Sequence, residues 1–142
     1  MPSLVTERIE SVKAGIVGAV AFVVARLTFT IVKNLIFVPV LNFAPTICDW
    51  TWSIQLAIGA VSGFLFGVTY RYIVRDDRNS HLNDGAVLAF GLVRGLASVE
   101  QNLALSQLSS GLFLITSSLV YFAIARLILD VAIARKFIKP FV

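Results

Sequence analysis

Four long apolar stretches, separated by short polar segments, constrain this chain more than any other feature of its sequence. They run over about residues 12–33, 50–74, 84–108 and 111–131. Each stretch has about the 20 residues that an α-helix needs to cross the hydrocarbon core of a bilayer. Only 14% of the residues are charged, whereas soluble domains carry about 25%. We therefore predict an all-α integral membrane protein in which residues 1–142 form a single domain of four transmembrane helices.

The segment that follows the first stretch has a different character. Leu35–Cys48 is apolar, but it is short and is interrupted by Pro39 and Pro45. Such a segment fits an interfacial or re-entrant position better than a membrane span. The four helices then form two hairpins. Ala21–Arg26 (AFVVAR) is similar to Ala89–Arg94 (AFGLVR), which predicts a weak parallel repeat that relates one hairpin to the other.

The basic residues of the termini and connecting segments predict how the chain is oriented. Those on one side of a four-span arrangement are Arg8, Lys13, Arg71, Arg75, Arg78, Arg135, Lys136 and Lys139, and only Lys33 lies on the other side. By the positive-inside rule, both termini and the polar loop 75–84 face the cytoplasm or a stroma. The net charge of +4 then reflects this orientation and contact with anionic lipid rather than binding of nucleic acid.

Several polar residues lie inside the predicted spans, where charged groups are costly and often functional. Arg26 lies roughly 20 Å along the first helix and Glu100 roughly 24 Å along the third, at 1.5 Å per residue. Gln55 and Asn102 fall at a similar depth. We predict an intramembrane polar cluster of these four residues, with Arg26 and Glu100 paired. The pair is interpreted either as a structural pin or as a site for a polar ligand, a proton or a cofactor oxygen.

Three further features concern helix contacts. Arg94 lies near the middle of the third span with no acidic residue at its depth, so backbone carbonyls, a lipid phosphate or a carboxylate of a partner chain must neutralise it. Arg126 and Asp130 are four residues apart and are predicted to form a structural pair. Gly59, Gly63 and Gly67 recur every four residues, a spacing that predicts a face for close helix packing.

Residues for catalysis or metal binding are few. The single cysteine, Cys48, cannot form an internal disulfide, and the single histidine, His81, lies alone in a polar segment. No spacing typical of a metal site, a nucleotide site or a catalytic triad occurs. We therefore predict no metal site and no enzymatic activity, and no cofactor is indicated.

The segment Arg71–Leu96, RYIVRDDRNSHLNDGAVLAFGLVRGL, is similar to small uncharacterised integral membrane proteins of cyanobacteria and plastids. The resemblance carries no assigned activity. It implies a thylakoid or plasma membrane of an oxygenic phototroph, and a role near photosynthetic complexes.

Together these features support three functional hypotheses. The first is a non-enzymatic accessory or assembly subunit of a larger membrane complex, which would explain Arg94 and the glycine face. The second is a small transporter or channel whose intramembrane charges line a polar site. The third is binding of a pigment or a quinone in an apolar groove.

Overall fold

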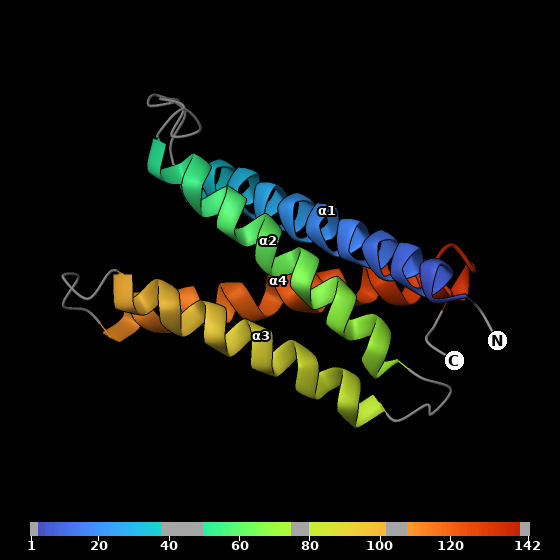
Figure 1. Ribbon diagram of the computed structural model, residues 1–142. Coiled ribbons are helices and arrows are strands. Elements are labelled where there is room, and N and C mark those ends of the chain that lie inside the picture. The colour runs from blue at the N-terminus through green and yellow to red at the C-terminus, as the bar shows by residue number, and fades with distance from the viewer. Residues whose placement is uncertain (1–2, 38–49, 75–79, 102–107, 140–142) are drawn as a thin grey trace.

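The computed structural model describes residues 3–37, 50–74, 80–101 and 108–139 of the chain. It contains four helices (Figure 1): α1 (Leu4–Phe37), α2 (Trp50–Ile73), α3 (Ser80–Gln101) and α4 (Leu108–Ala134). All four are long and apolar enough to cross a membrane, and the described residues include no strand. The predicted all-α class with four candidate membrane spans is therefore confirmed.

Helix α1 is longer than predicted at both ends. It begins at Leu4 because Ser3 caps it: the Thr6 backbone N–H donates to Ser3 Oγ at 3.3 Å, which satisfies one of the unpaired donors of the first turn. At its other end, α1 continues to Phe37. The start of the segment Leu35–Cys48 is thus helical, whereas the rest of that segment, including both prolines, lies outside the described residues.

Two predicted helix boundaries are wrong. The third stretch was predicted to begin at about residue 84, but α3 already begins at Ser80. The fourth was predicted to begin at about residue 111, but α4 begins at Leu108, so residues 109–111 (Ser-Ser-Gly) belong to its first turn. Weak helix formers are tolerated there because the first N–H groups of a helix need no intrahelical partner.

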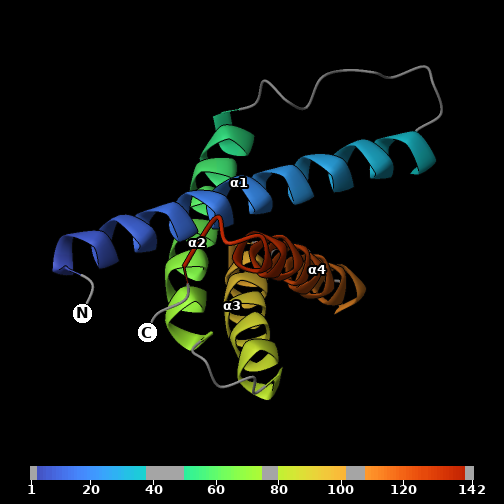
Figure 2. The same ribbon diagram turned by 90° about the vertical axis from the view of Figure 1, so that its right-hand side faces the viewer.

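The helices pack unevenly. The most extensive contacts join α1 to α2 and α3 to α4, and α1 also lies against α4. Figure 2 shows that α1 crosses α2, and in Figure 1 α2 and α3 come closest where α2 ends and α3 begins. Because α2 and α3 share only a small contact, α1 and α4 provide most of the connection between the two halves.

The crossing of α1 and α2 depends on glycine. Gly59, Gly63 and Gly67 are all buried in α2. A Cβ atom built on Gly63 would lie 2.8 Å from the Gly18 carbonyl oxygen and 2.7 Å from Phe22 Cβ. A Cβ atom on Gly67 would overlap the backbone of Ala14. The glycine face predicted from the sequence therefore lies directly against the backbone of α1.

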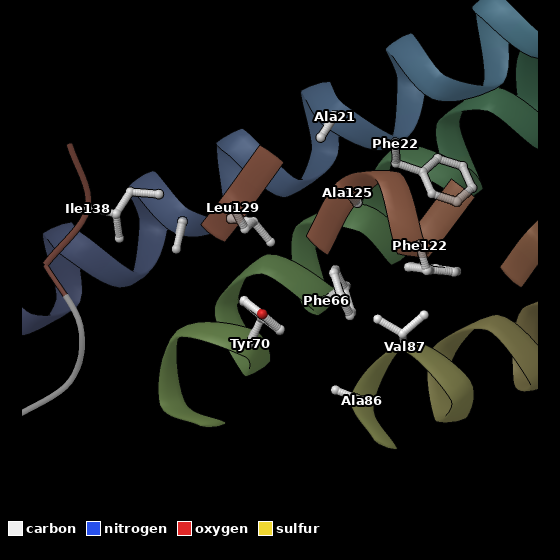
Figure 3. Packing of buried hydrophobic residues seen from close by; sticks show 11 residues of the cluster. Ala21, Phe22, Phe66, Tyr70, Ala86, Val87, Phe122, Ala125, Leu129 and Ile138 are labelled. Carbon is white, nitrogen blue, oxygen red and sulfur yellow. The ribbon is translucent and has the colours of Figure 1, made fainter. Parts of the chain in front are cut away.

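A cluster of aromatic rings connects all four helices beside this crossing (Figure 3). The Phe122 ring of α4 lies 5.1 Å from Phe22 of α1 and 5.2 Å from Phe66 of α2, measured between ring centroids. Phe90 of α3 lies 5.4 Å from Phe66. Phe22, Phe66 and Phe122 are at most 1% exposed, so these rings form the centre of the hydrophobic core.

We expect Gly63→Ala to destabilise the protein by about 1–3 kcal/mol, the usual cost of overpacking a close contact. The added methyl group would meet backbone atoms of α1, which cannot move aside as a side chain can. Thermal unfolding of the purified protein in a mild detergent measures the effect.

Gly85→Ala is the matched control, because a Cβ atom on Gly85 meets nothing within 4 Å. Helix propensity alone then favours alanine by about 0.5–1 kcal/mol. Equal unfolding temperatures for the two variants would contradict the close crossing of α1 and α2.

Candidate functional site

Polar side chains of the described helices gather in two places. One group, the end network, lies where α1 starts and α2 ends, and is centred on Arg71 and Tyr70. The other, the arginine cavity, lies near the start of α2, around Gln55. Along α2, Arg71 and Gln55 are separated by about 24 Å. The two groups are therefore separate sites on either side of the glycine crossing.

Arg71 is the hub of the end network, and its side chain is fully buried. Its Nη2 donates to Glu7 Oε2 at 2.5 Å, and its Nη1 donates to Ser11 Oγ at 2.6 Å and to the Glu7 carbonyl at 3.1 Å. Its Nε donates to the Lys139 carbonyl at 2.9 Å. One guanidinium thus holds α1, α2 and the segment after α4 together.

Glu10 holds the same C-terminal segment to α1. Its Oε2 accepts a hydrogen bond from the Lys139 backbone N–H at 3.1 Å, and its Oε1 accepts one from Lys13 at 2.9 Å. The chain turns back after α4 through Lys136, whose φ of 58° lies in the left-handed region. Ile138 is fully buried as a result. Glu7 and Glu10 therefore neutralise basic groups that the sequence analysis assigned to membrane orientation.

The second part of the end network joins α2, α3 and α4. Tyr70 donates to Asp130 Oδ1 at 2.5 Å. Arg126 Nε lies 3.6 Å from Asp130 Oδ2, too far for a hydrogen bond, and the closer partner of Arg126 is Asp84. The predicted Arg126–Asp130 pair is thus one link in a longer chain of contacts. Tyr70 and Asp84 could not be identified as partners from the sequence, because they lie on other helices.

The arginine cavity begins with two arginine side chains that meet at one glutamine. Arg26 of α1 donates from Nη1 to the Gln55 backbone carbonyl at 2.9 Å and from Nη2 to Gln55 Oε1 at 3.0 Å. Arg94 of α3 donates from Nη2 to the same Gln55 carbonyl at 3.2 Å. Two guanidinium groups from different helices therefore converge on a single acceptor residue.

Beside these groups is a cavity of about 100 Å³ that residues of all four helices line. Arg94, Ser98 and Gln101 face it from one side of α3, in agreement with their spacing of four and three residues. From α4 come Ser118 and Tyr121. The Ser118 side chain is buried, and its hydroxyl oxygen has no hydrogen-bond partner.

The predicted pair of Arg26 and Glu100 is wrong. No described carboxylate oxygen lies within 4.0 Å of either Arg26 or Arg94, and Glu100 is exposed. Glu100 follows the cavity-lining Ser98 by two residues, which rotates it about 200° around α3. Of the predicted polar cluster, the structure brings together Arg26 and Gln55 and adds Arg94, while Asn102 lies outside the described residues.

Little in the described part of the chain points to catalysis or metal binding. No group of three or more His, Cys, Asp or Glu side chains could hold a metal ion there. His81 is exposed, and Cys48 lies outside the described residues. No protein-family model matches the chain, and no match is found among curated proteins or solved structures.

The chemistry that the arginine cavity offers is binding. Its lining provides positive charge, N–H and O–H donors and apolar side chains, and the described lining residues include neither a carboxylate nor a histidine. Such a lining favours an anionic or acceptor-rich group. The end network differs because each of its arginines faces a carboxylate, which is the pattern of a structural clamp.

We expect Glu7→Gln to destabilise the protein by about 2 kcal/mol, because it removes the carboxylate from a fully buried guanidinium. Glu100→Gln is the matched control: Glu100 is exposed and makes no ion pair with the described residues, so its effect should stay within about 0.5 kcal/mol. Thermal unfolding in detergent measures both. A larger loss for Glu100→Gln than for Glu7→Gln would contradict the assignment of the clamp.

Proposed function

We propose that this protein is a non-enzymatic accessory or assembly subunit of a larger membrane complex. The observation that supports the proposal is an uncovered part of α1, residues 30–36, called here the α1 extension. Ile31 in this part is 61% exposed and Leu35 is 79% exposed. In Figure 2 the C-terminal end of α1 reaches past α4.

The length of α1 explains why this part is free. At 1.5 Å per residue, α1 with its 34 residues is about 51 Å long, whereas α2 with 24 and α4 with 27 residues are only about 36 Å and about 40 Å long. Among described contacts of the α1 extension, Lys33 lies over the Phe113 ring at 5.7 Å. A transmembrane helix of a partner subunit would cover the remaining apolar face.

The proposal includes a location and an orientation. The resemblance of Arg71–Leu96 supports a thylakoid or plasma membrane and a photosynthetic complex. The distribution of basic residues supports termini on the cytoplasmic or stromal side, in contact with anionic lipid. The pairing of helices as two hairpins, the parallel repeat and the interfacial or re-entrant segment stay predictions from the sequence.

Site-specific photocrosslinking in native membranes tests the proposal. A photoreactive residue at position 31 or 35 should crosslink to another protein chain, because the α1 extension is the proposed contact with the partner. The same label at position 127 of α4 is the control, since Leu127 is 63% exposed and lies outside the extension.

Crosslinked protein bands from positions 31 and 35, with lipid adducts from position 127, are the expected result. The unlabelled protein should also migrate with a larger assembly after solubilisation in a mild detergent. Lipid adducts alone at all three positions, together with migration as a single chain, would overturn the proposal.

The arginine cavity favours a second candidate, a small transporter or channel, because basic side chains line anion pathways in other membrane proteins. Uptake of nitrate or phosphate into liposomes containing the purified protein would support transport, and Arg94→Gln should then reduce it. Equal uptake by protein-free liposomes would exclude transport of these anions.

No observation of this kind supports binding of a pigment or a quinone. The central rings of Phe22, Phe66 and Phe122 are covered by one another and by the rest of the core.

A further inference from the structure

Among the described residues, no carboxylate compensates the positive charge in the arginine cavity. Arg26 and Arg94 are half-buried and lie in two of the candidate membrane spans. Each guanidinium has five N–H donors. The described contacts use two donor nitrogens of Arg26 and one of Arg94, all on Gln55. Two like charges that share a neutral acceptor in a medium of low dielectric call for a counter-anion.

An independent observation comes from the residues of α4 that line the cavity. Ser118 is on α4, its residue is 4% exposed, and its hydroxyl oxygen has no partner. Buried hydroxyl groups are almost always hydrogen-bonded, because an unpaired one costs stability. Ser118 lines the same cavity as both arginines. The cavity therefore has an unused hydroxyl in addition to unused guanidinium donors.

The size of the cavity limits what can occupy it. Its volume is about 100 Å³, whereas a single water needs about 10–15 Å³ on the same measure. On this measure the cavity holds the equivalent of roughly 7–10 water molecules, which is enough for a small oxyanion and is far below the several hundred Å³ of a typical site for a drug-sized ligand. Guanidinium groups bind oxyanions especially well, since two N–H donors can meet two oxygens at once.

We propose that the arginine cavity is a binding site for a small oxyanion. Arg26 and Arg94 supply the charge and the N–H donors, and Ser118 supplies an O–H donor from α4. This inference goes beyond the accessory role, and it holds whether or not the anion crosses the membrane. Water molecules alone would satisfy Ser118, but they would leave both positive charges uncompensated.

The test uses the purified full-length protein in a neutral detergent. Its unfolding temperature is measured in sodium nitrate or sodium phosphate and compared with sodium gluconate at equal ionic strength, because gluconate is too large for the cavity. A ligand that binds the folded state raises this temperature in a saturable manner. We expect saturable stabilisation by nitrate, by phosphate or by both, relative to gluconate.

Arg94→Gln should weaken this stabilisation by about tenfold or more in anion concentration, since it removes one charged donor group. It leaves both hydrogen bonds of Arg26 to Gln55 in place. Arg135→Gln is the matched control: it removes the same charge from an exposed position beyond α4, and it should keep the affinity of the parent protein. Equal anion dependence in the parent and Arg94→Gln would overturn the proposal, as would no anion dependence in the parent.

Ser118→Ala provides a second variant that is expected to fold. In gluconate it should unfold at the same temperature as the parent or higher, because it removes an unpaired buried hydroxyl. In nitrate or phosphate it should need a higher anion concentration for the same stabilisation. If Ser118→Ala keeps the full anion affinity of the parent, Ser118 is not a ligand and the site as proposed is wrong.

A final comparison distinguishes a free oxyanion from the phosphate of a lipid headgroup, which has the same chemistry. Vesicles of phosphatidylglycerol or of phosphatidylcholine replace the detergent, with gluconate as the only added anion. A gain in stability with phosphatidylglycerol that Arg94→Gln removes identifies the headgroup as the source. Stabilisation by nitrate or phosphate that is equal in both vesicle types identifies the free ion.

Discussion

The direct contact between the backbones of α1 and α2 is the constraint on which the rest of this structure depends. Gly18 and Gly63 approach so closely that neither position has room for a Cβ atom. Gln55 and Arg71 lie on α2 on either side of Gly63, and Glu7 and Arg26 lie on α1 on either side of Gly18. The crossing therefore brings Arg71 to Glu7 at one end and Arg26 to Gln55 at the other.

The two polar sites on either side of this crossing have opposite charge balance. In the end network, the buried Arg71 of α2 faces a carboxylate 2.5 Å away and binds both α1 and the segment after α4. In the arginine cavity, Arg26 and Arg94 share a neutral residue and no described carboxylate is near. A balanced cluster stabilises a fold, whereas an unbalanced one at a cavity is suited to receiving an anion. For this reason we place binding at the cavity and stability at the end network.

The depth of a residue along its helix correctly indicated part of the arginine cavity. The sequence did not indicate which face of each helix is turned toward the other helices. The rise of 1.5 Å per residue correctly placed Arg26 and Gln55 at one level. It also suggested Glu100, which the structure shows on the other side of α3 from Ser98. The sequence could not reveal Arg94 as the second donor to Gln55, nor Ser118 as a hydroxyl that lines the same cavity, because no local pattern specifies which helix faces meet.

The sequence by itself determined the class of the protein, since four long apolar stretches with few charges are stable as membrane-crossing helices. The spacing of Gly59, Gly63 and Gly67 likewise identified a face able to approach another helix closely. Only the tertiary structure decided that this face meets α1, that Arg71 is neutralised by Glu7, and that Arg26 and Arg94 share one acceptor. The physical reason is that helix formation depends on neighbouring residues, whereas the pairing of buried charges depends on residues far apart in the chain, such as Glu7 and Arg71.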